Sequence, residues 1–339
     1  MKTADFFYEL PDEAIAQTPI EPRHAARLLD TRTMTDRTFA DLPSMLESGD
    51  LVVVNNTRVR AARLRGTKAE TGGSVEVLLL SRREDGWEAL VRPARRIRVG
   101  TTISFASELS AIVIEPPSEG RCLLELHGPT DDMESAIAAA GEVPLPPYIH
   151  ASLSDPDRYQ TVYAGELGSA AAPTAGLHFS DSVLEELGRR GVGVVSVDLK
   201  VGLDTFRPIA VEKLSDHRMH SESVTVSVAT ASAINETHRQ GGRVVAVGTT
   251  VVRSLESAVA ETGLVHAFDG TTNLFINPGY RFRAIDGLIT NFHVPGSTLV
   301  VLVAAILGMG WRRVYEQALL RGYRFLSFGD AMYADVERS

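Results

Sequence analysis

Two histidines stand in polar stretches at which apolar elements end. His178 lies in the run GSAAAPTAGLHF, residues 168–179, and His293 lies in TNFHVPGS, residues 290–297. Imidazole titrates near neutral pH, so histidine is the commonest side chain in general acid and base catalysis. A single histidine is more often structural, but two at similar junctions strengthen the functional interpretation of each. The sequence therefore predicts proton transfer at both, with acid and base left unassigned.

The stretch 168–179 carries no charge before His178, and small residues fill most of it. It has neither a helical nor a strand period, and Pro173 would interrupt either element. We expect a loop that ends at Ser180, the N-cap of a following helix. Small side chains let a ligand approach the main chain, which makes Pro173, Thr174, Ala175 and Gly176 candidate ligand contacts. An ordinary connecting loop is the alternative.

Two further polar groups follow predicted buried strands. Gly248-Thr249-Thr250 opens a helix that also carries Arg253 and Glu256, and a helix N-terminus with free N–H groups favours an anion such as a carboxylate or phosphate. A plain threonine cap is the commoner case. The other candidates for substrate contacts are Asn55, Thr57 and Arg58 after one strand, and Asn291 beside His293.

Several enzyme classes lack their motifs here. There is no Walker loop, and Gly191-Val192-Gly193 lacks the third glycine of the dinucleotide fingerprint. No serine stands in a nucleophile elbow, which disfavours an α/β-hydrolase. His217 and His220 have no third metal ligand nearby, so no metal site is expected.

Composition indicates an ordinary globular protein with 44% hydrophobic and 23% charged residues. One cysteine excludes an intrachain disulfide and suits a reducing cytosol, and the first residues are not typical of a signal peptide. The longest apolar run, residues 299–307, is shorter than the roughly 18 residues that a membrane span needs. We therefore expect a cytoplasmic protein without a membrane association, and a monomer.

Two kinds of pattern divide the chain. Six short candidate strands, with turns and no helix between them, predict a small all-β barrel or sandwich. From about residue 150 strands and helices alternate, and the apolar strand 51–55 belongs with them. We expect an α/β fold with a discontinuous main domain, residues 1–58 and 150–339, and an inserted β domain, residues 59–149. The predicted β strands cover residues 59–64, 74–80, 87–91, 101–105, 111–115 and 121–127.

Charge is also unevenly distributed. Residues 58–98 contain eleven Lys/Arg and five Asp/Glu, which gives this segment a net charge of +6. Because the whole chain has a net charge of −9, the remaining residues together carry −15. Such a local basic segment can bind phosphates on an acidic protein, because salt screening keeps fields local. A solvated strand face is the alternative.

Taken together, these blocks resemble the queuosine-biosynthesis family of S-adenosylmethionine:tRNA ribosyltransferase-isomerases. The matching runs follow one another along nearly the whole chain, among them GDLVVVNNTRV, WEALVRPARRIRVG, GEVPLPPYI, GSAAAPTAGLHF, HRMHSE, RVVAVGTTVVRSLE, DGLITNFHVPGSTL and YRFLSFGDAMY. The resemblance implies an α/β barrel-like domain with an inserted small β-barrel.

The same resemblance implies a reaction. The ribosyl group of S-adenosylmethionine is transferred to 7-aminomethyl-7-deazaguanine at the tRNA wobble position and rearranges, giving epoxyqueuosine with release of adenine and methionine. S-adenosylmethionine is then a consumed substrate, and no cofactor or metal is implied. Thr249, Thr250 and Arg253 would suit the methionine carboxylate. The arginines that would suit tRNA phosphates are Arg92, Arg95, Arg96 and Arg98.

The chain departs from the family pattern after residue 196. The family usually reads VTLHVGAGTF, and here Lys200 replaces its histidine while Leu203-Asp204 replace Ala-Gly. Lys200 is therefore a third candidate catalytic residue, provided that burial or neighbours adapt it to act as a base. One alternative is a diverged relative that binds tRNA or a nucleoside without catalysis. Another is a nucleoside hydrolase or a methyltransferase of unusual fold.

Overall fold

The computed structural model describes residues 1–118, 120–129, 132–202 and 208–338. The chain forms two compact units, one of Met1–Arg58, Pro146–Glu166 and Ala172–Ser339, and one of Val59–Leu145 and Leu167–Ala171. The sequence did not single out residues 167–171 as part of the second unit. The predicted change at Leu203-Asp204 lies outside the described residues.

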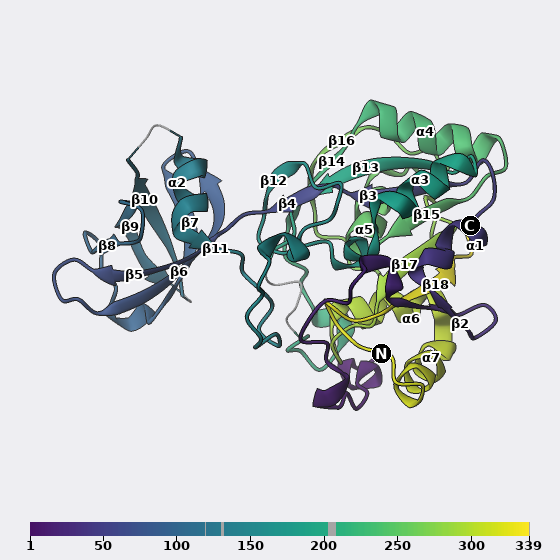
Figure 1. Ribbon diagram of the computed structural model, residues 1–339, viewed down its shortest axis with the longest axis horizontal. Helices are drawn as coiled ribbons and strands as arrows, with labels where there is room; N and C mark the ends of the chain where they lie inside the picture. Colours follow the sequence, from purple (N-terminus) through teal and green to yellow (C-terminus); the bar gives the residue numbers. More distant parts are fainter. Residues whose placement is uncertain (119, 130–131, 203–207, 339) are drawn as a thin grey trace. The chain divides into compact units, whose positions relative to one another are not determined.

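The main unit is built on a mixed sheet of nine strands (Figure 1). Its central strands β13, β3, β15 and β17 pair in parallel, as do β18 and β1, whereas the remaining neighbours are antiparallel. The strands, in sheet order, are β16 (Phe268–Thr272), β14 (Glu222–Val226), β13 (Gly193–Leu199), β3 (Leu51–Asn55), β15 (Val244–Val247), β17 (Gly287–Asn291), β18 (Ala331–Asp335), β1 (Arg27–Asp30) and β2 (Thr35–Thr38).

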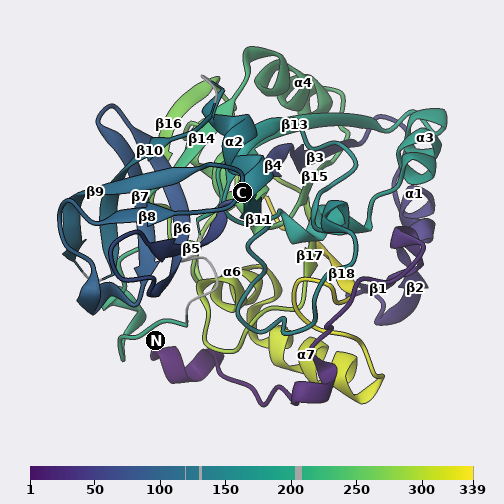
Figure 2. The same ribbon diagram turned by 60° about the vertical axis from the view of Figure 1, so that its left-hand side comes forward.

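Helices cover this sheet and begin at serine caps in three cases. Ser180, Ser227 and Ser297 each accept a hydrogen bond from an N–H of the first helical turn, which satisfies a donor that would otherwise have none. Helices α4 and α5 both contact β3, β13 and β15, and Figure 2 shows α6 beside α7. The helices are α1 (Leu42–Met45), α3 (Asp181–Arg189), α4 (Val228–Arg239), α5 (Thr249–Ala258), α6 (Thr298–Leu307) and α7 (Trp311–Leu320).

The second unit is a closed antiparallel barrel of six strands, as the sequence predicted. Pairing of β5 with β8 closes the ring β5-β6-β7-β10-β9-β8, and the short β11 (Gly141–Glu142) adds to β5. Cys122 is buried within it, and burial raises the pKa of its thiol to about 11. The barrel strands are β5 (Arg63–Lys68), β6 (Ser74–Arg83), β7 (Gly86–Arg92), β8 (Thr102–Ser104), β9 (Ser110–Ser118) and β10 (Arg121–His127), with helix α2 at Met133–Ala140.

Some predicted elements were wrong. Residues 273–276 and 323–327 are not strands, and the last strand of the chain is β18. The alternating apolar residues of 323–327 bury Tyr323 and Phe325 in the core, but Leu326 has φ +69°, which ends any extended run. The sequence did not predict β1 and β2. A barrel strand was expected at residues 59–64, but Val59 ends the short β4 (Thr57–Val59), which pairs with β12 (Glu166–Ser169), and the barrel strand β5 begins at Arg63.

Residues Thr298–Leu320 would be long and apolar enough to cross a membrane by composition alone, with a mean hydropathy of 1.4. In the structure this stretch is two helices, α6 and α7, separated by a 3-10 turn at Gly308–Gly310. Val300, Val303 and Trp311 pack in the hydrophobic core of the main unit. The stretch is therefore an interrupted pair of core helices.

A buried ion pair holds the starts of β3 and β15 together. Asp50 accepts hydrogen bonds from the N–H groups of Glu47 and Arg243, both at 2.9 Å, and from Arg243 Nη2 at 2.6 Å. Burial alone would raise the pKa of this carboxyl, but the hydrogen bonds outweigh it, so the pKa lies below its ordinary value. The ionised form is therefore the one that stabilises the fold.

We expect Asp50→Asn to lower the free energy of unfolding by about 3 kcal/mol at neutral pH, because it leaves Arg243 without its counter-charge. The lowered native pKa means that this contribution is complete above the unfolded pKa of about 4 and is lost as the pH falls through the native pKa. Urea unfolding of both proteins at several pH values measures the difference. An unchanged gap between them at the lowest pH would contradict the electrostatic explanation.

Candidate active site

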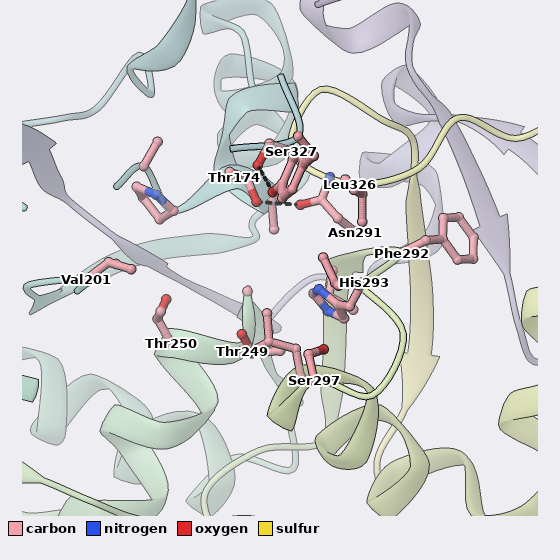
Figure 3. Close-up of a pocket in the computed structure, with 18 residues that line it drawn as sticks. Thr174, Val201, Thr249, Thr250, Asn291, Phe292, His293, Ser297, Leu326 and Ser327 are labelled. Carbon is pink, nitrogen blue, oxygen red and sulfur yellow. Dashed lines mark hydrogen bonds between the residues drawn. The ribbon is translucent and has the colours of Figure 1, made fainter. Parts of the chain in front are cut away.

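A cavity opens where the parallel strands of the main unit end, with about 590 Å³ of empty space that continues to solvent (Figure 3). Small-molecule sites in open α/β sheets usually lie at this edge. Its walls come from the loop 172–175, from the N-terminal turns of α5 and α6, and from the residues that follow β17. Of the residues that the structure describes, none that lines the cavity carries a formal charge at neutral pH. Those with polar side chains are Tyr148, Thr174, Thr249, Thr250, Thr290, Asn291, His293, Ser297 and Ser327.

The predicted loop contains a short 3-10 helix, Thr174–His178. Of the four predicted ligand contacts in this loop, Pro173, Thr174 and Ala175 line the cavity, but Gly176 does not. Gly176 is required for packing instead, because a Cβ at this position would lie 2.1 Å from the hydroxyl of Tyr163. The small residues of this stretch therefore line the cavity on one side and allow close packing against Tyr163 on the other.

His293 faces the cavity from the segment after β17 (Figure 3). Its Nε2 lies 2.9 Å from Thr290 Oγ1, and its main-chain N–H donates to the hydroxyl of Tyr315 at 3.3 Å. Burial lowers the pKa of its imidazole to about 3. A neutral, oriented imidazole at the cavity wall can accept a proton from a ligand.

His178 lines a smaller neighbouring cavity rather than this one. Asn291 connects the two, since its Nδ2 lies 3.3 Å from His178 Nε2 while its Oδ1 accepts from Thr174 Oγ1 at 2.9 Å. Burial lowers the pKa of His178 to about 3, and the charges of Arg324, Arg158 and Arg23 add to the effect. The structure therefore places His178 behind Asn291, as the residue that orients the amide.

The N-terminus of α5 points its first turn at the cavity. Gly248 precedes it at φ +89° and offers no side-chain cap, so the first N–H groups have no capping partner there. Thr249 and Thr250 both line the cavity, and the Thr250 hydroxyl is buried without a hydrogen-bond partner among the described residues. Such an arrangement of donors suits an anion, and an anion site here stays a prediction.

Four predicted residues near β3 and β13 do not line the cavity. The Asn55 side chain joins two strands, donating to the Leu199 carbonyl at 3.0 Å and accepting from its N–H at 3.1 Å. Thr57 is fully buried, Arg58 is exposed, and Lys200 is exposed at the end of β13. Val201, the next residue, lines the cavity in place of Lys200.

Arg253 and Glu256 are also engaged by the protein itself. Arg253 forms a buried ion pair with Glu222 and donates to the Leu274 carbonyl at 3.1 Å. Glu256 accepts from Tyr280 at 3.1 Å and from the N–H of Ala284 at 3.0 Å, and burial raises its pKa. Neither side chain reaches the cavity, because both lie further along α5 than the first turn.

The four predicted tRNA-binding arginines lie in the barrel unit. Arg92 ends β7, and the others lie in or beside the 3-10 turn Ala94–Arg96. All four side chains are exposed, and none forms an ion pair with a carboxylate within the described part of the chain. The four are Arg92, Arg95, Arg96 and Arg98.

Some residues near the cavity were not predicted. Tyr148 donates to or accepts from Ser327 at 2.8 Å, and both line the cavity from segments distant in sequence. Asp198 lies on β13 two residues before Lys200 and outside the cavity lining, and burial raises its pKa. Tyr148 and Ser327 stand in runs that resemble the family, PLPPYI and RFLSFGD, which is the signal that could have found them.

A polar cavity with a neutral imidazole in its wall has the features of a site for a small polar molecule. The family model described as "Queuosine biosynthesis protein" matches residues 3–334. The chain is 49% identical to the S-adenosylmethionine:tRNA ribosyltransferase-isomerase of Symbiobacterium thermophilum and 51% identical to that of Moorella thermoacetica, in each case over 98% of this chain and 99% of the relative. The chain therefore belongs to the queuosine-biosynthesis family of S-adenosylmethionine:tRNA ribosyltransferase-isomerases.

A crystal structure is also similar to the chain. It is the S-adenosylmethionine tRNA ribosyltransferase from Thermotoga maritima, with 36% identity and a TM-score of 0.54 over 97% of this chain and 99% of that one. The family, the enzyme class and the α/β fold with a β-barrel predicted from the sequence are confirmed.

We expect the rings of His178 and His293 to remain neutral from about pH 8 to about pH 5, because both pKa values lie near 3. NMR spectra of the imidazole protons, assigned with His178→Gln and His293→Gln, measure this directly. Because the unfolded chain binds these protons below about pH 6.5 and the native state does not, each histidine also lowers stability as the pH falls below that value. Titration of either ring near pH 6.5 would contradict the described burial.

Proposed function

We propose that this enzyme transfers the ribosyl group of S-adenosylmethionine to the aminomethyl group of 7-aminomethyl-7-deazaguanine at the wobble position of a tRNA. The ribose rearranges to an epoxycyclopentane, which gives epoxyqueuosine, and adenine and methionine leave. S-adenosylmethionine is consumed as a substrate, and neither a cofactor nor a metal takes part. The relatives at 49% and 51% identity are named S-adenosylmethionine:tRNA ribosyltransferase-isomerases, which supports the transfer of a ribosyl group to tRNA, and the cavity with His293 is the observation that supports the proposal in this chain.

The positively charged sulfur makes the ribose protons beside it more acidic. The reaction needs a base to remove one of these protons. His293 is the group we assign to this step. It is neutral at physiological pH, held by Thr290, and placed in the cavity wall. When the proton leaves carbon, its electron pair stays with the ribose, and methionine later departs with the electrons of the carbon–sulfur bond. His178 acts as a positioning residue through Asn291.

The methionine carboxylate is assigned to the first turn of α5. The N–H groups of this turn and the hydroxyl of Thr250 offer donors to an anion, and among the described residues no carboxylate lines the cavity to compete. Pro173, Thr174 and Ala175 form the opposite wall, and Asn291 presents its amide between them and His293. We assign no step to Lys200, because it is exposed and does not line the cavity.

The tRNA backbone is assigned in part to the barrel arginines, because exposed and unpaired guanidinium groups bind phosphates without regard to sequence. The reacting base must leave its stack to bring the amine into the cavity. The enzyme is proposed to act as a cytoplasmic monomer.

The decisive experiment incubates the enzyme with S-adenosylmethionine and tRNA that carries the deazaguanine, and identifies the products by mass spectrometry. We expect adenine and methionine to appear together, and only when the modified tRNA is present. Production of S-adenosylhomocysteine would instead reveal a methyltransferase. Binding of tRNA without either product would identify a non-catalytic relative.

We expect His293→Gln to lower kcat for adenine release by about 10²- to 10⁴-fold, the usual contribution of a general base. His266→Gln is the matched control, because His266 is an exposed histidine of the same unit. The KM for S-adenosylmethionine should change little, since the carboxylate site is intact. A His293→Gln enzyme with wild-type kcat would refute the assignment of the base.

A further inference from the structure

The main chain of His293 is held by two tyrosine hydroxyls from other parts of the sequence. Its N–H donates to Tyr315 Oη at 3.3 Å, and its carbonyl accepts a hydrogen bond from Tyr8 Oη. Tyr8 lies 285 positions before His293 in the chain, and Tyr315 belongs to α7. Neither tyrosine is among the described residues that line the cavity, so each can act on a ligand there only through His293.

These two hydrogen bonds set the direction in which His293 faces the cavity. The N–H and the C=O of a residue belong to the two rigid peptide planes on either side of its Cα, so holding both groups fixes where its Cβ points. The contact between His293 Nε2 and Thr290 Oγ1, at 2.9 Å, then sets the angle of the ring. The main chain and the imidazole of His293 are therefore held by separate hydroxyl groups.

The Tyr8 ring packs among the aromatic rings of the main unit's core. Its centroid lies 5.0 Å from that of Tyr315, with an angle of 70° between the rings, and 6.4 Å from that of Trp311. Edge-to-face pairs of this kind are favourable and restrict the ring's position. Burial raises the pKa of the Tyr8 hydroxyl, and the neighbouring Tyr315 adds to the effect, so the hydroxyl keeps its proton and can donate it in a hydrogen bond at neutral pH.

The N-terminal segment, residues 1–8, contacts the loop that follows His293 at a second point. The N–H of Gly296 donates to the Phe6 carbonyl at 3.0 Å. Gly296 has φ +68°, and a Cβ at this position would overlap the ring of Phe7. A glycine is therefore required here for two reasons, its backbone conformation and the close approach of the N-terminal segment.

The segment is itself fixed to the rest of the main unit. The N–H of Thr3 donates to the Glu212 carbonyl at 2.9 Å, and its hydroxyl donates to the Val211 carbonyl at 2.6 Å. Arg312, on α7, donates to the Phe7 carbonyl at 3.0 Å. Because the segment is held before and after the point at which it meets the loop, it provides a rigid support from which the Tyr8 hydroxyl reaches His293.

We propose that Tyr8 positions His293 for proton abstraction, which makes the N-terminal segment, residues 1–8, a functional part of the active site. This inference rests on the function proposed above, in which His293 is the base. A base must lie within hydrogen-bond reach of the proton that it takes, and a misplacement of about 1 Å can lower a rate by about 100-fold. Tyr8 is a positioning residue, because its hydroxyl is engaged with a main-chain carbonyl and transfers no proton.

Tyr8→Phe tests the assignment, because it removes the hydroxyl and keeps the ring that packs in the core. We expect kcat for adenine release to fall by about tenfold, with KM for S-adenosylmethionine within about threefold of wild type, since the turn assigned to the carboxylate is unchanged. Tyr323→Phe is the matched control. It also loses one hydroxyl hydrogen bond in the same hydrophobic core, to Asp36 at 2.7 Å, and should keep the wild-type kcat.

A double-mutant cycle shows whether Tyr8 acts through His293. In a His293→Gln background the base is already absent, so Tyr8→Phe should cause no further loss of kcat. A general loss of stability or packing would instead lower kcat in both backgrounds. A wild-type kcat in Tyr8→Phe, or an equal loss of kcat with and without His293, would overturn the proposal.

The NMR signals of the His293 imidazole provide a readout that does not depend on turnover. We expect them to move or split in Tyr8→Phe and also in Tyr315→Phe, which removes the other hydroxyl, whereas Tyr323→Phe should leave them in place. Unchanged His293 signals in Tyr8→Phe would overturn the proposal. If the wild-type enzyme released no adenine from its substrate, the proposed function would fail, yet the comparison of spectra would still decide whether Tyr8 orients His293.

Discussion

Burial of β3 on both faces is the constraint on which the main unit depends. All five residues of this strand are buried, and it pairs in parallel with β13 on one side and β15 on the other. A strand in this position has no room for polar side chains along its length, so they collect where the strands end. Asn55 is the clearest example, because its amide continues the ladder to Leu199 beyond the end of the strand. The cavity is the space that the ends of these parallel strands leave at one edge.

Much of this architecture follows from local patterns. The apolar run at residues 51–55, the serine caps and the glycine-rich turns of the barrel each fix an element through nearby residues alone. The stretch 168–179 and the helix opened by Gly248-Thr249-Thr250 were likewise singled out from local sequence, although Gly176 of that stretch does not line the cavity. In contrast, Tyr323 and Phe325 alternate with polar residues as in a strand, but both pack in the hydrophobic core and belong to no sheet. This packing depends on residues far away in the sequence, so the local pattern could not predict it.

The site was less predictable than the fold for a related reason. Junction position and residue type singled out Thr249, Thr250, Asn291 and His293, and all four line the cavity. They could not show that the Arg253 guanidinium faces Glu222, since that pairing joins residues 31 positions apart in different elements. They also could not separate His178 from His293, because only the fold shows that Asn291 lies between the first of them and the cavity. Spacing identifies which residues can meet, whereas direction and burial determine what they meet.

The distribution of charge differs between two neighbouring cavities. In the described part of the chain the main cavity has polar but uncharged walls, whereas Arg253, paired with Glu222, lines a second cavity with Leu274 and Phe275. Helix N–H groups supply positive potential to the first without a counter-ion that would need to be displaced. The second holds formal charges that neutralise each other and are held out of water.

The buried position of Cys122 has a practical consequence. It is the chain's single cysteine, and its raised thiol pKa leaves little of the reactive thiolate at neutral pH. Maleimide reagents should therefore attach almost entirely to cysteines introduced at the surface. Pairs of fluorophores, one on the barrel and one on the main unit, could then follow the distance between the units as RNA is added. Labelling of the native Cys122 should therefore add little fluorescence to that measurement.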